Sequence, residues 1–402
     1  MNRPRSGAPD SSVRPGVDSN AQLVVEQVLE AADQQRASDV HIEQLGDQVV
    51  VRLRVDGRLR VWRTLPNELL PQVVSRLKVL ARMDIAEKRM PQDGRFSIVS
   101  AQGSRDYRVA TVPMLDGEKV VVRLLMHNLS KLDFRKVGYT ERNATLYETL
   151  LAKPHGLVLH CGPTGSGKTT ALYAAINHLR QDWRNIQTIE DPVEGRLDGV
   201  SQAQVNPDIG LTFAKLLRGF LRQDCDIILV GEIRDPETAA LAVQASLTGH
   251  LVLGTLHTNS AIGAVSRLAE MGVPAFFVGT GLIGAVSQRL VRRLCKNCRR
   301  PYQPTAEQQT QLGLRPEHVL YAAVGCDECG KLGFRGRIGI QEVLPISPEL
   351  RDAICKTAAD HDLHRLALTS GLVTMFRDGL AKSVMGLTTM EEVYSAVLAD
   401  GT

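Results

Sequence analysis

The sequence GPTGSGKTT, at residues 162–170, constrains the fold of this chain more than any other stretch. A short apolar run, Leu157 to Cys161, precedes it, and a segment rich in Ala and Leu with helical spacing follows. Strand, glycine-rich loop and helix in this order are typical of a phosphate-binding loop, in which backbone N–H groups converge on phosphate oxygens and the helix dipole adds to their attraction. A glycine-rich turn that matches by chance is the alternative, and the flanking strand and helix argue against it. The sequence therefore predicts a nucleotide site.

This loop supplies the first group of candidate residues. We expect Lys168 to reach the β- and γ-phosphates of ATP and Thr169 to give its hydroxyl to Mg²⁺. The predicted nucleotide-binding set is Gly162, Pro163, Thr164, Gly165, Ser166, Gly167, Lys168, Thr169 and Thr170.

Polar side chains follow three further apolar segments after the loop. Glu190 ends the first, Glu232 lies just beyond the run at 227–230, and His257 follows the run at 251–256. An apolar strand that ends in an acid is common, and a lone histidine is more often a surface residue. Because parallel strands of an α/β sheet direct their carboxyl ends into one ligand crevice, we expect these three side chains to lie near the loop.

Length and composition limit the class of protein. A chain of 402 residues is long enough for two or three domains, and 43% hydrophobic with 23% charged residues is typical of a soluble globular protein. The net charge of +4 and the 4% aromatic content give no reason to expect a nucleic-acid partner. We find no charged-then-apolar leader, and the longest weakly polar run, 272–286, is shorter than the roughly 20 residues of a membrane-spanning helix. We therefore expect no transmembrane segment and a cytoplasmic location.

Apolar periodicity and turn residues divide the chain. Helical repeats at 21–36 and 69–83, together with a hairpin turn at Asp56-Gly57, predict an α+β domain. The segment before it is rich in Pro and Gly and is expected to be disordered. The predicted organisation is a tail at 1–20, an α+β domain at 21–125, a linker at 126–138 and an α/β ATPase domain at 139–402, which includes a four-cysteine subdomain at 290–335 and C-terminal helices at 340–402.

The chain contains seven cysteines, and four of them form two CxxC pairs: Cys295 and Cys298, then Cys326 and Cys329. Two chelating pairs of thiolates fit a tetrahedral Zn²⁺ site, and four protein ligands leave no position for a catalytic water. We interpret this as a structural metal site, with disulfides or a redox pair as the alternatives. We expect the other three cysteines to be ordinary buried thiols: Cys161, Cys225 and Cys355.

Four blocks of sequence, in this order, resemble the secretion ATPase superfamily of type II secretion and type IV pilus assembly. They are GPTGSGKTT, TIEDPVE, ILVGEIRDPET with the following AVQASLTGH, and LGTLHTN. In that family they are the Walker A, Asp-box, Walker B and His-box motifs, and the resemblance runs from about residue 20 to the C-terminus. The CxxC pairs and the closing GLTTMEEV resemble the secretion and pilus-extension branch, since retraction ATPases generally lack the cysteine domain.

The resemblance implies a homo-hexameric ring in which the α+β domain sits over a RecA-like domain with ATP between them. It also changes the interpretation of several arginines, because an isolated arginine near a strand is most often a surface group. By family position Arg95 and Arg108 would reach the phosphates, and Arg218 and Arg222, at i and i+4 of one expected helix face, would reach the same charge. The catalytic set implied is Glu190 to orient the attacking water, Glu232 to help hold Mg²⁺, His257 to sense the γ-phosphate, and Arg95, Arg108, Arg218 and Arg222.

The function implied is ATP hydrolysis that drives pseudopilus assembly and protein export by a type II secretion system. Its partners would be inner-membrane platform proteins, which would hold the ATPase peripherally at the inner membrane. Extension of a type IV pilus is the alternative within the family. A nucleic-acid translocase is disfavoured by charge and aromatic content, and a non-hydrolysing scaffold is disfavoured because both acidic residues are present.

Three features depart from the family pattern. Relatives that serve type II secretion commonly carry a longer N-terminal region for docking at the inner membrane, whereas about 20 residues precede the first domain here. Cys225 stands where proline is usual, and Gly254 stands where serine is frequent. We expect neither substitution to abolish turnover.

Overall fold

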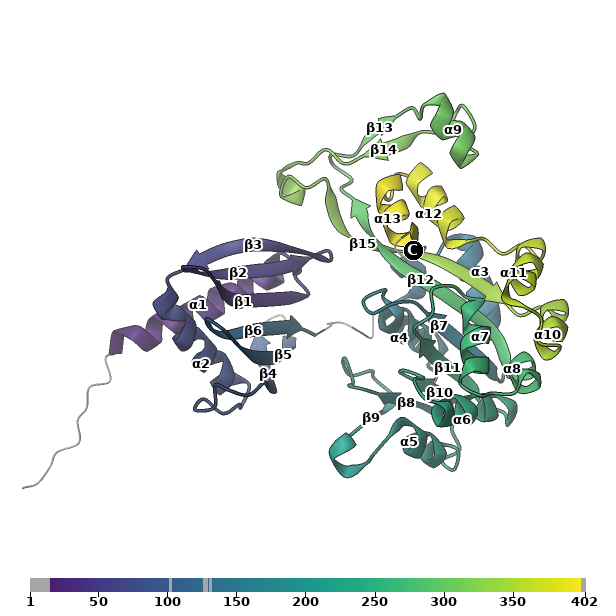
Figure 1. The fold of residues 1–402 in the computed structure, drawn as a ribbon, viewed down its shortest axis with the longest axis horizontal. Helices are drawn as coiled ribbons and strands as arrows, with labels where there is room; N and C mark the ends of the chain where they lie inside the picture. Colours follow the sequence, from purple (N-terminus) through teal and green to yellow (C-terminus); the bar gives the residue numbers. More distant parts are fainter. Residues whose placement is uncertain (1–14, 101–102, 126–128, 130–131, 399–402) are drawn as a thin grey trace, which may run out of the picture. The chain divides into compact units, whose positions relative to one another are not determined.

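The structure is a computed structural model that describes residues 15–100, 103–125, 129 and 132–398. The chain divides into two compact units, Met1–His127 and Asn128–Thr402. We call them the N-terminal unit and the P-loop unit and describe each by itself (Figure 1).

The N-terminal unit is an antiparallel sheet covered by helices. Its helices are α1 (Pro15–Gln34) and α2 (Leu70–Leu80), with a 3-10 turn η1 (Asn67–Leu69) before α2. Its strands are β1 (Asp39–Leu45), β2 (Gln48–Val55), β3 (Arg58–Leu65), β4 (Gln92–Ser100), β5 (Gly103–Met114) and β6 (Gly117–Leu124), in the spatial order β3-β2-β1-β6-β5-β4. Alternate residues such as Val49, Val51 and Leu53 are buried beneath the helices, because strand side chains point to opposite faces in turn.

The N-terminal boundary differs from the predicted one. Most of the predicted tail, residues 1–20, lies outside the described residues, but α1 already begins at Pro15. Proline is well accommodated in the first turn of a helix, where its missing N–H has no intrahelical partner. The expected disordered tail included Pro15, whereas this residue begins α1.

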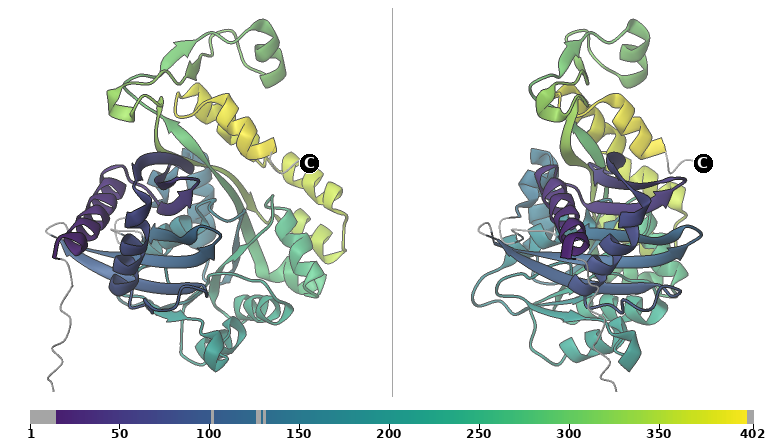
Figure 2. Two further views of the ribbon diagram at one scale, coloured as in Figure 1. Left: turned by 60° about the vertical axis from the view of Figure 1, so that its left-hand side comes forward. Right: turned by 90° about the vertical axis from the view of Figure 1, so that its left-hand side faces the viewer.

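The P-loop unit is built on a seven-stranded mixed sheet with helices on both faces (Figures 1 and 2). The spatial order is β15-β12-β7-β11-β10-β8-β9. The strands are β7 (Gly156–Cys161), β8 (Ile186–Glu190), β9 (Ser201–Gln204), β10 (Ile227–Val230), β11 (Leu251–Leu256), β12 (Leu282–Leu294) and β15 (Phe334–Pro345). Neighbours from β12 to β9 run parallel, and β15 runs antiparallel to β12.

The two faces of this sheet have separate cores. On one face α3 (Glu141–Leu151) and α4 (Lys168–Leu179) pack with Val158 and Leu253. On the other face Leu157 and Leu159 contribute to a core with a second group of helices. These are α5 (Phe213–Phe220), α6 (Pro236–Leu247), α7 (Gly263–Glu270), α8 (Ala275–Gly281), α10 (Pro348–Cys355) and α11 (Asp360–Thr369). The sheet is therefore the middle of three layers, which is why every residue of β7, β10 and β11 is buried.

The segment predicted as a linker, 126–138, is partly a packed piece of the P-loop unit. Residues 126–128 and 130–131 lie outside the described residues, but a 3-10 turn, η3 (Phe134–Val137), follows them. Phe134 is buried and makes edge-on ring contacts with Tyr139 and Tyr147. One aromatic residue in a polar segment is enough to anchor it to the core.

The four-cysteine segment forms an extension at one end of β12 and β15. It contains β13 (Arg300–Tyr302), α9 (Ala306–Leu312) and β14 (Leu320–Ala322), and it lies beside α12 (Met375–Val384) and α13 (Met390–Leu398) in both views (Figures 1 and 2). None of the helices within the described residues combines the length and apolar character needed to span a bilayer.

Candidate functional site

The glycine-rich loop joins β7 to α4 at the carboxyl end of the sheet. Gly165 and Gly167 have φ angles of +79° and +89°, a region that favours glycine. Lys168, the first residue of α4, donates from Nζ to the carbonyl oxygen of Pro163 at 3.1 Å and also to that of Gly162. Burial lowers the pKa of Lys168. The lysine therefore closes over its own loop, where an incoming phosphate could take over as the partner of the ammonium group.

Glu232 and His257 are in contact with each other just after the ends of β10 and β11. The Nε2 atom of His257 lies 2.9 Å from Oε1 of Glu232, and Nε of Arg234 lies 2.5 Å from the same oxygen. Burial alone would raise the pKa of Glu232, but the hydrogen bond from Arg234 and the positive charges of Arg234, His257 and Lys168 outweigh it and lower the pKa. The carboxylate is thus ionised and within electrostatic reach of the loop lysine.

Glu190 occupies the predicted strand end but has a different environment. It is the last residue of β8 and is buried. Its carboxylate accepts hydrogen bonds from the hydroxyl of Tyr173, from Oγ1 of Thr188 at 2.7 Å and from Nε2 of Gln202 at 3.1 Å. In this arrangement Glu190 is held by α4, β8 and β9, whereas Glu232 is held by residues of the loops.

A cavity of about 460 Å³ opens next to the Glu232 and His257 pair. One wall comes from the residues that follow β10 and β11, and the other from α7 and the start of α11. On the second wall Ser266 donates to Asp360 at 2.5 Å, and Arg267 pairs with Glu270 at 2.9 Å. No sequence motif points to this wall, because α7 and α11 are about 90 residues apart and neither carries a recognisable motif.

The structure corrects the expected placement of Arg218 and Arg222. Helix α5 ends at Phe220, so only Arg218 is on the helix and the two arginines do not share one helix face. The guanidinium of Arg218 pairs with Glu237 at 2.5 Å, and Arg222 donates from Nη1 to the carbonyl oxygen of Arg218 at 2.9 Å. Gly219, which lowers helix stability, lies between them and precedes the helix end by one residue.

Arg95 and Arg108 stand opposite each other in the N-terminal unit. Arg95 on β4 pairs with Arg108 on β5, which pairs in turn with Arg123 on β6. Directly paired residues of antiparallel strands share a face of the sheet, and like charges in such positions repel. The row ends at Asp39, whose Oδ1 lies 2.8 Å from Nε of Arg123. The row therefore concentrates positive charge on one face of the sheet.

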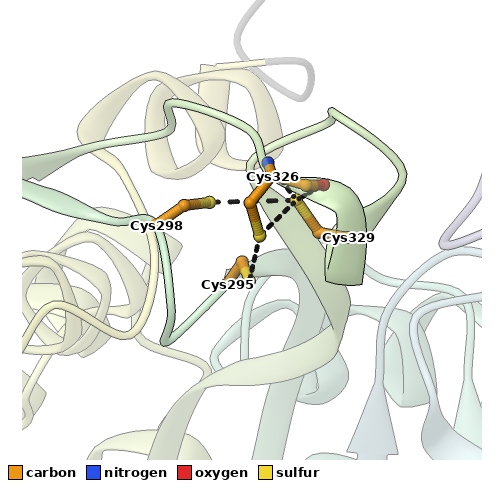
Figure 3. A group of neighbouring side chains, drawn as sticks. All are labelled: Cys295, Cys298, Cys326 and Cys329. Atoms are coloured by element: carbon orange, nitrogen blue, oxygen red, sulfur yellow. Dashed lines mark hydrogen bonds between the residues drawn. The ribbon is translucent and has the colours of Figure 1, made fainter.

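The four predicted cysteines converge into one cluster (Figure 3). Their sulfur atoms lie within 4.8 Å of one another. The Cys295–Cys326, Cys298–Cys329 and Cys326–Cys329 sulfur distances are 3.9, 3.8 and 3.7 Å. A tetrahedral ion with bonds of about 2.3 Å to sulfur places its ligands about 3.8 Å apart, so the thiols fit zinc. These separations do not fit the disulfide alternative, whose sulfur atoms are bonded at about 2.05 Å.

The other three cysteines differ in exposure. Cys161 and Cys225 are buried, as expected, and burial raises the pKa of Cys161 to about 11. Cys355 is half-buried at the end of α10.

Two site residues that the sequence analysis missed lie on β12. Gln288 donates from Nε2 to the carbonyl oxygen of Ser166 in the loop at 2.8 Å. Arg289 donates to Oδ1 of Asn259, two residues after His257, at 3.2 Å. Strand β12 lies next to β7 and so reaches both loops, but its sequence contains no motif that points to this role.

Comparison with known proteins identifies relatives from secretion and pilus assembly systems. A profile of the family described as Type II/IV secretion system protein matches residues 17–395. The chain is 48% identical to a type II secretion system protein E of Pectobacterium carotovorum over 96% of this chain and 78% of that protein. It is 44% identical to the type IV pilus assembly ATPase PilB of Thermus thermophilus over 95% of this chain and 43% of that protein.

Solved structures resemble the fold. The Legionella pneumophila ATPase DotB superposes with a TM-score of 0.70 at 22% identity and covers 98% of both chains. The pilus retraction motor PilT with bound ADP gives a TM-score of 0.64 at 26% identity, over 92% of this chain and 95% of that one.

Proposed function

Because this chain belongs to the type II/IV secretion system protein family, we propose that it hydrolyses ATP to drive pseudopilus assembly and protein export by a type II secretion system. Relatives named type II secretion system protein E, 48% identical over 96% of this chain, support this function. The mixed α/β fold of DotB and PilT, both ATPase or motor proteins by name, agrees with it.

The observation that carries the proposal is the contact between Glu232 and His257, together with the charge of Lys168 that acts on Glu232. Lys168 donates a hydrogen bond to its own loop, whose glycines favour the close approach of an anion. Glu232, which contacts His257, lies within electrostatic reach of Lys168. A positive group for phosphate beside an ionised carboxylate for Mg²⁺ is the arrangement that phosphoryl transfer needs. The parallel order of β7, β11, β10 and β8 supports a RecA-like core around this site.

Each site residue has a role in this proposal. Residues 162–170 hold the phosphates, and Thr169, exposed at the start of α4, offers its hydroxyl to the metal. Mg²⁺ would neutralise charge that develops on the transferred group. Glu232 helps to hold that ion through its surrounding water, His257 contacts the γ-phosphate, and Glu190 orients the attacking water. Arg234, missed from sequence, keeps Glu232 ionised and in place.

The arginines complete the site by adding positive charge. Arg95 and Arg108 come from the N-terminal unit, and Arg218 and Arg222 come from the P-loop unit. Their guanidinium groups would balance negative charge spread over the γ-oxygens. Closure of the arginines on the nucleotide would couple hydrolysis to movement of one unit against the other.

At the level of the assembly we propose a homo-hexamer that works at the cytoplasmic side of the inner membrane on platform proteins, without nucleic acid. Zn²⁺ would be a structural ion that cross-links the two ends of the extension through Cys295, Cys298, Cys326 and Cys329.

A substitution in the host tests the function. Lys168→Ala removes the phosphate contact, so secreted proteins in the medium and surface pili are assayed side by side in that strain. Loss of secreted proteins with pili intact supports the type II secretion function. Loss of pili and twitching with secretion intact would move the protein to pilus extension, which the 44% identity to PilB makes the second candidate. No change in either would leave the ATPase serving another machine and overturn the proposal.

A further inference from the structure

A chain of buried polar side chains connects the phosphate-binding loop to the C-terminal helices. Gln288 on β12 donates from Nε2 to the carbonyl oxygen of Ser166 at 2.8 Å. Gln341 on β15 donates from Nε2 to Oε1 of Gln288 at 3.4 Å. Lys382 on α12 donates from Nζ to Oε1 of Gln341 at 2.8 Å. All three linking side chains are buried, so water does not compete for these contacts.

The far end of the chain is a buried ion pair. The side chains of Lys382 and Asp378 are each 1% exposed and in contact. Asp378 also accepts from Nδ2 of Asn143 at 3.2 Å and from the backbone N–H of Gln341 at 2.9 Å. Lys382 donates in addition to the carbonyl oxygen of Gly339 at 2.7 Å. Partners from α3, β15 and α12 thus hold both charges in one geometry, which is what a buried pair needs in order to persist.

The charge of Lys382 fixes the direction of both amides. An ammonium group can only donate, so the oxygen of the Gln341 amide must face it. The nitrogen of Gln341 then faces Gln288, whose amide must turn its own oxygen toward Gln341. The remaining end of Gln288 is its nitrogen, and this end meets the carbonyl oxygen of Ser166. A neutral residue at position 382 would remove this constraint and leave the carbonyl oxygen of Ser166 as the one group at the ends of the series that still orients the two amides.

The contact with Ser166 sets the orientation of one peptide group in the loop. In a planar trans peptide the C=O of Ser166 and the N–H of Gly167 point in opposite directions. Holding the carbonyl toward β12 therefore turns the N–H of Gly167 away from β12. A Cβ atom at Gly167 would lie 2.8 Å from Nε2 of Gln288, so only glycine allows this approach without a shift. If the peptide turned over, a carbonyl oxygen would replace an N–H as the group available to an anion.

We propose that Gln288 is a positioning residue for the phosphate-binding loop, and that the Lys382–Asp378 pair on α12 sets the nucleotide affinity of the loop through Gln341 and Gln288. The inference rests on the proposed nucleotide site and adds to it a control point outside the site. Because Arg377 of the same helix donates to the carbonyl oxygen of Leu312 in the cysteine extension at 3.0 Å, a shift of that extension can reach α12.

The test is a double-mutant cycle in the full chain, with the dissociation constant for ADP as the readout. Gln288→Met removes the contact with Ser166 without adding charge, and Lys382→Met with Asp378→Leu removes the ion pair as a whole. We expect each change to weaken ADP binding by about tenfold. The combination should bind no more weakly than Gln288→Met alone, because the ion pair acts through Gln288.

A matched control separates this effect from general destabilisation. Arg292 on β12 pairs with Glu392 on α13 at 2.6 Å and also ties a C-terminal helix to the sheet, but these side chains are not part of the chain to Ser166. Arg292→Met with Glu392→Leu should leave the ADP dissociation constant within about twofold of the parent while it lowers the melting temperature. If the ion-pair variant fails to fold, Gln341→Met replaces it in the test. This change interrupts the series of hydrogen-bonded side chains without removing a charge, and it should weaken ADP binding as Gln288→Met does.

Three results would overturn the inference. ADP affinity unchanged in folded Gln288→Met or Gln341→Met would remove the positioning role. Losses that add fully in the combined variant would break the link between α12 and Gln288. A parent protein that binds no ADP would remove the proposed nucleotide site itself, and the inference with it.

Discussion

At the scale of a residue, two glutamates at the ends of neighbouring strands have different surroundings. Glu190 is the last residue of β8 and Glu232 lies two residues after β10, so each carboxylate comes at the end of an apolar run. Glu190 is 4% exposed and its oxygens accept from Tyr173, Thr188 and Gln202. Glu232 instead faces His257 and Arg234 and senses the charge of Lys168. The strand ends were predictable from apolar runs, but the donors around each carboxylate come from distant segments and were not.

The environment of Glu232 leads to the first prediction. Glu232→Gln keeps the size of the side chain but removes the charge that would help to hold Mg²⁺, so we expect nucleotide binding to persist and kcat to fall by about 100-fold or more. Steady-state turnover and ADP binding in the purified protein measure both. Glu317→Gln, at an exposed ion pair with Arg315, is the control and should turn over normally. Unchanged hydrolysis in Glu232→Gln would remove this residue from the site.

His160 gives a second residue-scale prediction, for the pH dependence of stability. Its Nε2 atom lies 2.7 Å from the hydroxyl of Tyr147 in the core, and burial, with the nearby charge of Lys168, lowers the pKa of His160 to about 3. Between that value and the ordinary pKa of about 6.5, the unfolded chain binds a proton that the folded chain does not. Stability contributed by this group is therefore complete above pH 6.5 and falls by up to about 1.4 kcal/mol per pH unit below it.

Urea unfolding at about pH 7, 6 and 5 measures that slope. His160→Gln should lose less stability on acidification than the parent, whatever its absolute stability, because it has no proton to take up. His155→Gln, at an exposed histidine outside the core, should keep the parent slope. Equal slopes in parent and His160→Gln would show that His160 titrates alike in both states.

At the scale of elements, the sequence pattern predicted the strands and helices whose own residues determine which side is buried. The apolar run at 227–230 became β10 with the same bounds, and the helical repeat at 69–83 became α2 (Leu70–Leu80). Strand β12 was not predicted, because its sequence mixes polar and apolar residues and its partner β7 lies about 120 residues earlier. Asp378 and Lys382 are spaced like an exposed i,i+4 pair, and only tertiary packing buries them.

The cysteine extension gives the element-scale prediction. Cys298→Ser removes one of four thiolates, so we expect the protein to lose its zinc and the extension to unfold locally, with lower solubility. Metal content by elemental analysis and protease sensitivity of the segment between β12 and β15 test this. Cys355→Ser, a half-buried thiol outside the cluster, should retain one zinc per chain. Stoichiometric zinc in Cys298→Ser would refute the four-thiolate site.

At the scale of the whole molecule, the arginine row and the phosphate-binding loop belong to different units. Arg95, Arg108 and Arg123 lie opposite one another across β4, β5 and β6, and Arg123 at one end of the row pairs with Asp39. Like charges in directly opposite positions repel, so this face of the sheet concentrates positive charge. Sequence could predict the arginines only through family resemblance, because their alignment depends on strand register.

The last prediction concerns the charge of this row. Replacing Arg108, the middle member of the row, by Gln keeps a polar side chain and removes one of three like charges, and denaturant unfolding of the N-terminal unit checks that the sheet remains folded. If the row balances charge on the transferred phosphoryl group, the same change should lower kcat by about 100-fold or more. Arg63→Gln on β3, whose guanidinium donates to Gln27, is a control in the same sheet and should keep full turnover. A variant with unchanged turnover would separate the arginine row from catalysis, and a variant that is both inactive and unstable would make Arg108 a structural residue. Loss of activity with retained stability would support a role for residues of both units in one reaction.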